Sequence, residues 1–386
     1  MRDRFHVIHM VWLFALCLAG LGAMGAEFSQ VRLPLFRGIW YPDTAEALRK
    51  ACEQYISEAS LPMPVRGRVV ACVAPNAGYV HSGGTAAYAF KPLGSGQYDR
   101  VIVLTAAHTA RFAGTSIPLV QHYATPLGLV PLDISACRRV AWSSLIEPRG
   151  VSYHDTGRGA SRRLNVHEFE HGIEVLLPFL QVQLGTFELV PLVVGDLMDA
   201  NGRIRSSAVR SIAGVLNRVV DERTLIVVSS NFTHYGQQYG YTPFRENEAE
   251  GIEWLDKQAM HYVLNRDLNG FLDYLENTRN TIDGAAPLAI LIAMLPARVE
   301  GYLLNYTSGA RNMTEGGSSV SYAALVFSDP AAPPNESRQP SQAAPWEPAD
   351  TSDISLDGMT GPITGDDTAG RLPQDADDES ADAPEE

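Results

Sequence analysis

Several polar side chains in this sequence stand at the ends of apolar runs, where chemistry is often found. They are Asn76, His108, Glu170, His171, Asn231, His234 and Asp283. Imidazoles and carboxylates are the groups that bind transition metals and that transfer protons near neutral pH. If folding gathers these residues, the sequence predicts metal binding or acid/base catalysis, with the two amides as hydrogen-bonding groups for a ligand.

Taken singly, each residue also has an ordinary structural explanation. His108, in LTAAHT, could be a surface residue after a strand, and Asp283 before Gly284 could form a turn or cap a helix. Asn231 could form an Asx turn. The combination favours a site, because open α/β sheets place ligand sites at the carboxyl ends of their strands.

Strand-like runs that could position these side chains recur along the chain. The predicted strands are residues 69–75, 100–107, 187–195, 224–231, 301–308 and 319–328. Their nearly continuous apolar character is typical of strands that are covered on both faces.

Helical patterns alternate with these strands. The clearest predicted helix spans residues 44–59, with Thr44 as its N-cap; the others cover residues 84–92, 171–184, 203–220, 246–277 and 285–297. The alternation predicts an α/β fold, a single-domain αβα sandwich around a mostly parallel or mixed sheet, over residues 35–328.

The two ends of the chain differ from this body. Residues 1–26 contain Arg2 and Arg4, an apolar run and small residues, which predicts a signal peptide or an N-terminal anchor. The protein is therefore expected to be exported, to the periplasm or the cell envelope, with a possible envelope association through its N-terminus. The last 58 residues, 329–386, are rich in Pro, Gly and acidic residues and predict a disordered acidic tail.

The charge is concentrated in that tail. Fifteen Asp and Glu but only Arg338 and Arg371 lie in residues 329–386, so this segment supplies most of the net charge of −14. The body is close to neutral and offers no basic face, which argues against nucleic acid as a partner. Beyond the N-terminal run the cysteines are Cys52, Cys72 and Cys137; without a CxxC pair they indicate neither a zinc knuckle nor a disulfide framework.

Six segments in order resemble those of the Memo family, known in prokaryotes as AmmeMemoRadiSam system protein B. The segments are VAPNAGYVHSGGTAAYA, VIVLTAAH, EFEHGIEVLLPFLQ, LIVVSSNFTHYGQQY, NTIDGAAPLAIL and SSVSYAALVF. The resemblance covers residues 36–328. It implies a fold similar to class III extradiol dioxygenases, with a pocket at strand ends that in the dioxygenases binds non-haem iron. In Memo proteins the pocket has been associated with metal binding and with phosphopeptide binding.

The resemblance also implies roles for single residues. His108 corresponds to a metal ligand, His234 to a general base, and Glu170 and His171 to the conserved EHSIE segment of the family, which implies catalytic roles for them. Asn76 stands where the family has a metal-ligating His, Asn231 replaces an Asp, and Asp283 replaces a Cys. Tyr235 follows His234 in the family motif and is expected to contribute to ligand binding.

Asn76 has a chemical consequence for the metal expected from the family, iron. The usual iron(II) site needs two imidazoles and one carboxylate. His108 and Asp283 supply one of each, whereas Asn76 offers only an amide oxygen, which suits hard cations better. His81, five residues further on, is a possible replacement.

Three functions follow from these residues. The first is a degenerate dioxygenase-like pocket that binds a small molecule, a peptide or a metal. The second is a metal-dependent, dioxygenase-like oxidoreductase of the non-haem iron type. The third is a cell-envelope scaffold that works through its acidic tail. The replacement of an imidazole and an Asp by amides favours the first.

Overall fold

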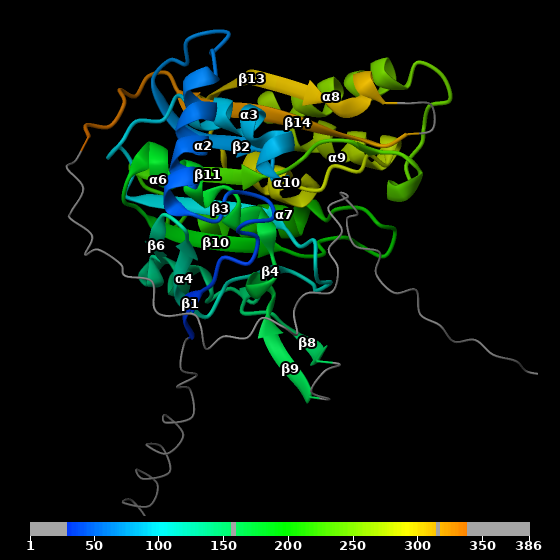
Figure 1. The fold of residues 1–386 in the computed structure, drawn as a ribbon. Helices are drawn as coiled ribbons and strands as arrows, with labels where there is room; N and C mark the ends of the chain where they lie inside the picture. The colour runs from blue at the N-terminus through cyan, green and yellow to red at the C-terminus, as the bar shows by residue number, and fades with distance from the viewer. Residues whose placement is uncertain (1–28, 156–159, 314–316, 338–386) are drawn as a thin grey trace, which may run out of the picture.

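The computed structural model describes residues 29–155, 160–313 and 317–337, and a central sheet dominates this part of the chain (Figure 1). Four neighbouring strands of the sheet are parallel. In their order across the sheet they are β2 (Arg68–Ala74), β11 (Thr224–Ser229), β3 (Arg100–Ala106) and β10 (Glu188–Val194). Their carboxyl ends therefore lie at one edge of the sheet.

Antiparallel strands extend the sheet on both sides. β14 (Ser319–Asp329) pairs antiparallel with β2, with β13 (Glu300–Ser308) and with β12 (His234–Tyr235). At the other side β4 (Thr115–Ser116) pairs antiparallel with β10 and carries β7 (Ile146–Glu147). The sheet is mixed, as the sequence predicts.

Helices cover the sheet on both faces. On one face, α2 (Ala45–Glu58) packs against α3 (Tyr79–Phe90) and α6 (Leu177–Leu184). On the other, α10 (Ala285–Met294) packs against α7 (Ser206–Leu216) and α9 (Leu268–Thr278), and α8 (Glu248–Leu264) lies beside α9 (Figure 1). All six residues of β11 are buried, which explains its continuous apolar run.

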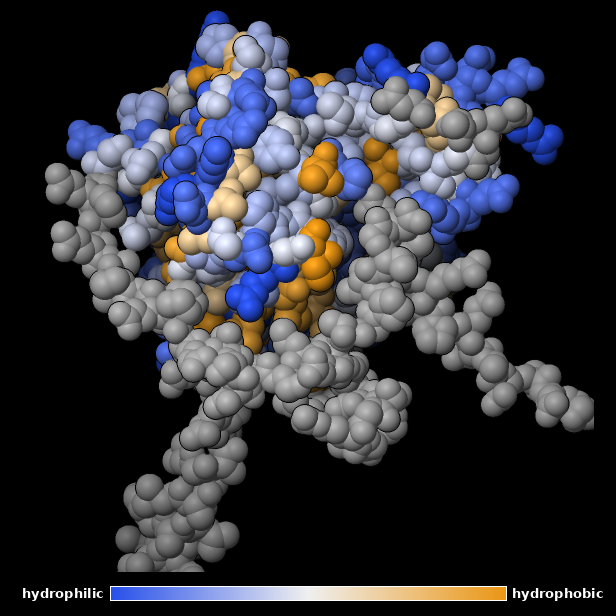
Figure 2. Space-filling model, in the orientation of Figure 1, coloured by the Kyte–Doolittle hydropathy of each residue, from blue (hydrophilic) through white to orange (hydrophobic). Residues whose placement is uncertain are grey.

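The surface shown in Figure 2 is mostly polar, and apolar residues are exposed there in small patches. The large apolar side chains that are exposed include Ile39 and Val80, at 59% and 85%. Scattered exposure of this kind is ordinary for a folded domain.

Smaller elements complete the fold. β1 (Ser29–Arg32) pairs with β5 (Val120–Thr125), which pairs with β6 (Gly128–Pro131), and β8 (Gly150–Asp155) pairs with β9 (Ala160–Asn165). The remaining helical elements are α4 (Ile134–Val140), α5 (His171–Glu174), η2 (Val166–Glu168), η3 (Gln237–Tyr239) and η4 (Gly309–Asn312).

The six predicted strands are all present, each within two residues of its expected bounds. The helices differ more. α3 begins at Tyr79, five residues before the predicted start, and the predicted helix 171–184 is divided into α5 and α6. The predicted helix 246–277 is also wrong as one element. It is broken between α8 and α9, where Arg266 has a φ of 56° that a continuing right-handed helix excludes.

The structure describes only part of the two ends of the chain. The predicted signal peptide or anchor and residues 338–386 lie outside the described residues. The start of the predicted tail lies against the body, because the side-chain amide of Asn335 donates to the carbonyls of Gln97 and Glu222. Cys52, Cys72 and Cys137 are buried and free. Among the described residues, no helix has the length and apolarity needed to cross a membrane.

Candidate functional site at the strand ends

The candidate site lies at the shared carboxyl edge of β2, β11 and β3. Asn76 comes two residues after β2, Asn231 two after β11 and His108 two after β3. Glu170 and His171 begin α5, and Asp283 precedes α10. The parallel arrangement of the three strands is what brings these distant segments together.

Glu170 orients the ring of His108. The Nδ1–H of His108 donates to Glu170 Oε1 at 2.7 Å, and the backbone N–H of His108 donates to Oε2 at 2.9 Å. Oε1 also accepts from the backbone N–H groups of His171 and Gly172, as the N-cap of α5. These four hydrogen bonds hold the buried carboxylate in place, and the Nε2 atom of His108 is left for other partners.

Asp283 meets His108 from the opposite side. Its Oδ2 atom lies 3.4 Å from His108 Nε2. Its Oδ1 atom accepts from the backbone N–H of Asn231 at 2.8 Å and from the hydroxyl of Ser230 at 3.2 Å. The carboxylate is therefore tethered to the end of β11.

The two carboxylates determine the charge of His108. Burial alone would lower the pKa of His108, but the charge of Glu170 and the hydrogen bond with Asp283 raise this pKa to about 10. Burial alone would raise the pKa of Glu170, and the charge and hydrogen bonds of His108 bring it down to about 2. His108 is thus a cation between two anions in the metal-free protein.

His171 is the second imidazole of the candidate site. Its ring centroid is 4.3 Å from that of His108, and the Trp40 ring covers it at 4.4 Å. Burial, followed by repulsion from charged His108, lowers the pKa of His171 to about 4. His171 is therefore neutral at physiological pH, which is the form that binds metals.

His108, Glu170 and His171 form a group that could hold a metal ion. Each offers one ligand atom, and these atoms lie within 4.8 Å of one another. Two imidazoles and one carboxylate are a donor set found in iron and zinc sites. The sequence predicted His108 as a ligand but assigned Glu170 and His171 to catalysis.

Asn76 is buried with unused hydrogen-bonding capacity. Its backbone N–H donates to Asn231 Oδ1 at 3.0 Å, which links the ends of β2 and β11. Within the described residues, neither its side-chain oxygen nor its nitrogen has a hydrogen-bond partner, although the residue is only 1% exposed. Each unmade bond of this kind costs about 1–3 kcal/mol, so the side-chain amide is a candidate contact for a water molecule, an ion or a ligand.

His234 is fixed by its own neighbours. Its Nδ1–H donates to the carbonyl of Thr281 at 3.0 Å, its backbone N–H donates to the Thr281 hydroxyl, and the ring of Tyr239 lies edge-on at 5.1 Å. The contact with a carbonyl fixes the tautomer, since a carbonyl only accepts. Nε2 is consequently the atom able to accept a proton or contact a ligand.

Two predicted binding residues lie outside the His108–Glu170–His171 group. Tyr235 is 1% exposed, and its hydroxyl donates to Glu248 at 2.7 Å and lies 3.1 Å from the carbonyl oxygen of Phe244. It packs β12 against the start of α8. His81 is exposed in the first turn of α3, where it lines a different pocket with Tyr239.

A segment that the sequence reasoning missed forms the cover over His171. Glu174 accepts hydrogen bonds from the side chains of Arg32 and Tyr41 and from the backbone N–H groups of Leu35 and Phe36. This buried clamp holds residues 33–41, and with them Trp40, over the site. The available signal was the aromatic-rich stretch PLFRGIWYP, which precedes the first predicted helix.

Gly172 allows α5 to approach the sheet. A Cβ atom at this position would lie 2.0 Å from Thr105 Oγ1 and 3.0 Å from Ser229 Oγ. The hydroxyl of Ser229 donates to the carbonyl of Gly172 at 2.7 Å. The distance between Glu170 and the strand ends depends on this close approach.

Comparisons with known proteins find relatives over most of the chain. A family described as Memo-like protein matches residues 32–326. The protein memo-1 homolog of Caenorhabditis elegans is 30% identical over 303 residues, which cover 75% of this chain and 80% of the homolog. Human MEMO1 is 29% identical, covering 74% of this chain and 94% of its own. A MEMO1 family protein of Thermococcus kodakarensis is 30% identical, covering 77% and 99%.

A solved structure of an uncharacterized Escherichia coli K12 protein is more distant. It covers 67% of this chain and 99% of its own, with 13% identity and a TM-score of 0.40.

Proposed function

Because the chain belongs to the Memo family, we propose that it binds a divalent metal ion at the strand-end site and presents it to a small-molecule or peptide ligand. The proposed ligands are His108 Nε2, Asp283 Oδ2 and Asn76 Oδ1, and the ion would displace the proton that Nε2 carries in the cationic form of His108. The observation that carries the proposal is the His108 ring, held through Nδ1 by a buried carboxylate with Nε2 facing a second one. A carboxylate behind the imidazole is the usual way in which proteins orient a metal-binding His.

One distance supports this pair of ligands. Two ligand atoms bound to one ion at about 2.0–2.1 Å are roughly 3.4 Å apart when the geometry is tetrahedral. His108 Nε2 and Asp283 Oδ2 are 3.4 Å apart. The unsatisfied amide of Asn76 supports a third contact, since an oxygen without a partner is available for a cation.

The rival ligand set is His108, Glu170 and His171. It offers two imidazoles, which suits iron better than the set with Asn76 does. However, an ion at Glu170 would compete with the hydrogen bonds that fix both His108 and the start of α5. This competition favours the Asp283 side, with His171 as a neighbouring group.

Metal analysis of purified, tag-free protein tests the proposal. We expect close to one ion per chain after equilibration with iron(II), zinc or calcium followed by dialysis, and loss of this ion in His108→Ala and in Asp283→Asn. His171→Ala should keep it. The matched control is His261→Ala, which removes an exposed imidazole of α8 and should leave the metal content unchanged.

Two results would count against this assignment. If His108→Ala carried as much metal as the wild type, the proposed site would be excluded. If His171→Ala lost the ion while Asp283→Asn kept it, the metal would belong to the rival set.

The alternative function is a metal-dependent oxidoreductase of the non-haem iron type. The observation in its favour is His234, whose Nε2 atom is left as an acid/base group by the bond from Nδ1 to Thr281. Bound iron would supply Lewis-acid and redox chemistry, and His234 would accept a proton from a ligand hydroxyl. Dioxygen uptake by iron(II)-loaded protein with catechol as the probe tests this, and uptake unaffected by His234→Gln would contradict the role of His234.

We also propose export of the protein, on the basis of its N-terminal sequence. The support is the pattern of Arg2, Arg4 and an apolar run followed by small residues. Cell fractionation and N-terminal mass analysis of the mature chain test it, and a chain recovered from the cytoplasm with an unprocessed N-terminus would contradict it.

A further inference from the structure

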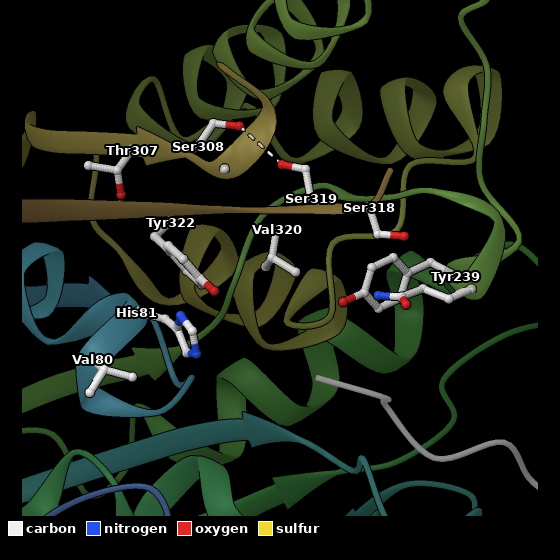
Figure 3. Close-up of a pocket in the computed structure, with 11 residues that line it drawn as sticks. Val80, His81, Tyr239, Thr307, Ser308, Ser318, Ser319, Val320 and Tyr322 are labelled. Atoms are coloured by element: carbon white, nitrogen blue, oxygen red, sulfur yellow. Dashed lines mark hydrogen bonds between the residues drawn. The ribbon is translucent and has the colours of Figure 1, made fainter. Parts of the chain in front are cut away.

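A pocket lined in part by Tyr239, whose ring contacts that of His234, differs chemically from the strand-end site. It has a volume of about 580 Å³ and is bounded by the first turn of α3, by η3 and by the adjoining ends of β13 and β14 (Figure 3). Pockets that bind small organic molecules usually measure about 300–1,000 Å³. The volume is therefore sufficient for a ligand of two sugar rings.

Hydroxyl groups dominate the lining of this pocket. They belong to Tyr239, Thr307, Ser308, Ser318, Ser319 and Tyr322. None of the described lining residues is Asp, Glu, Lys or Arg; the other polar groups are the amide of Gln238 and the imidazole of His81. A lining of this kind lacks the Arg or Lys that recognition of phosphate or carboxylate favours.

Hydrogen bonds to nearby hydroxyls position three of the lining hydroxyls, those of Thr307, Ser308 and Ser319. Thr307 Oγ1 lies 2.8 Å from Thr85 Oγ1, and Ser308 Oγ lies 3.5 Å from Ser319 Oγ and accepts from Ser321 at 3.1 Å. Each hydroxyl can act as a donor or as an acceptor. A row of them therefore matches a ligand whose own groups are hydroxyls, because either partner can donate.

Aromatic side chains lie at both ends of the pocket. Figure 3 shows the Tyr322 hydroxyl pointing toward the His81 ring, with Tyr239 and Ser318 at the other end. Tyrosines offer an apolar ring face together with a polar tip, the combination that suits a sugar ring. Tyr239 also contacts the ring of His234 at 5.1 Å, so a ligand here would end beside the strand-end site.

We propose that this pocket binds a neutral polyhydroxyl ligand of the saccharide class, about the size of a disaccharide. The hydroxyl-rich lining, the absence of charged side chains among its described residues and the two tyrosines carry the inference. It does not depend on metal binding at His108, and the two proposals can fail separately.

Saturation-transfer NMR and titration calorimetry with maltose, cellobiose and lactose test the proposal. We expect at least one of these sugars to bind with a dissociation constant of about 1 mM or below, and p-nitrophenyl phosphate to bind more weakly. Tyr322→Phe, which removes one hydroxyl, should weaken sugar binding about three- to tenfold. Thr307→Trp, at an exposed rim position, should abolish it.

The control is Tyr302→Phe, which removes a hydroxyl of β13 that donates to Glu300 outside the pocket. It should leave the sugar affinity unchanged, and thermal unfolding should confirm that every variant is folded. Metal content should be the same in all of them. The proposal is overturned if none of the three sugars binds, if binding survives Thr307→Trp, or if the phosphate probe binds more tightly than the sugars.

Discussion

Asn76 is the residue whose replacement should change the chemistry of the site most. Asn76→His would place a second imidazole at the end of β2, where a buried amide now has no hydrogen-bond partner among the described residues. We expect the affinity for iron(II) or zinc to increase by at least about tenfold, since even changes behind the ligands alter metal affinity by about 10- to 100-fold. Competition with a chromogenic chelator measures this.

Asn201→His, at an exposed loop position, is the control for adding an imidazole anywhere on the chain. Equal metal affinities of Asn76→His and the wild type would show that residue 76 does not face the ion.

His167 should make the fold sensitive to acid. Its Nε2–H donates to the carbonyl of Ser116, and its Nδ1 accepts from the hydroxyl of Tyr123, so the neutral ring is fully satisfied. Burial lowers the pKa of His167 from 6.5 to about 3. The unfolded chain, in which His167 has its ordinary pKa of about 6.5, takes up this proton at a higher pH than the folded protein does. The free energy of unfolding should therefore fall as the pH drops from about 6.5 toward 3, by up to about 1.4 kcal/mol per pH unit.

Urea unfolding between pH 7 and pH 4 measures this loss. The slope of unfolding free energy against pH should be smaller in His167→Gln than in the wild type, while His261→Gln, at an exposed position of α8, should keep the wild-type slope. Parallel curves for all three proteins would contradict the prediction.

At the scale of elements, the clamp around Glu174 ties the segment before α2 to α5. Glu174→Gln would leave the buried guanidinium of Arg32 without its counter-charge. Removing one partner of a buried ion pair costs about 3–5 kcal/mol, and we expect a loss of this size in the free energy of unfolding. Hydrogen exchange of residues 33–41 should also become faster.

Glu253→Gln is the matched control, because Glu253 pairs with Lys257 and Arg311 at the surface. An exposed pair contributes about 0–1 kcal/mol, so this variant should unfold almost like the wild type. Equal losses of unfolding free energy in Glu174→Gln and Glu253→Gln would show that the clamp stabilises the fold no more than an exposed ion pair does.

The elements that sequence reasoning predicts well are those with a strong periodic or apolar signal. The six long strands and α2 meet this condition. The break between α8 and α9 does not, because Arg266 adopts a left-handed conformation without a Gly or Pro to announce it. Short strands such as β4 and β7 depend on pairing with distant partners, which a local pattern does not reveal.

The residues of the site divide in the same way, into those with a local sequence signal and those that depend on distant contacts. The contact of His108 with Asp283 could be predicted because one follows a strand and the other precedes a helix at one edge of the sheet. The same reasoning places Asn76 at that edge. The proximity of His171 to His108, and the cover formed by Trp40, depend on packing between segments far apart in the chain. Nothing in the spacing of HEFEHGIE reveals that Glu170 caps α5 and orients His108 with the same carboxylate.

At the scale of the whole molecule, the residues just after β14 belong to the folded body. The backbone N–H of Arg68 donates to the carbonyl of Ala332, and Asn335 bridges Gln97 and Glu222. A chain ending at Ser328 should therefore lose about 2 kcal/mol or more of unfolding free energy, since each hydrogen bond contributes about 0.5–1.5 kcal/mol.

A chain ending at Ser337 keeps these contacts and should unfold within about 0.5 kcal/mol of the full chain, because the sequence predicts no packed core beyond it. Thermal and urea unfolding of the two shortened chains measure the difference. Equal stability of the two would show that residues 329–337 contribute nothing to the fold.

The dimensions of the strand-end site depend on a residue that has no side chain. Gly172 lies where any Cβ would collide with Thr105, and Glu170 and His171 directly precede it. Gly172→Ala would add one methyl group there and push Glu170 and His171 away from β3. Every candidate ligand and acid/base residue would still be present. Mutational libraries aimed at changing what this site accepts should therefore vary position 172 as well as the imidazoles and carboxylates. The distance between α5 and the strand ends depends on the absence of a Cβ atom at Gly172.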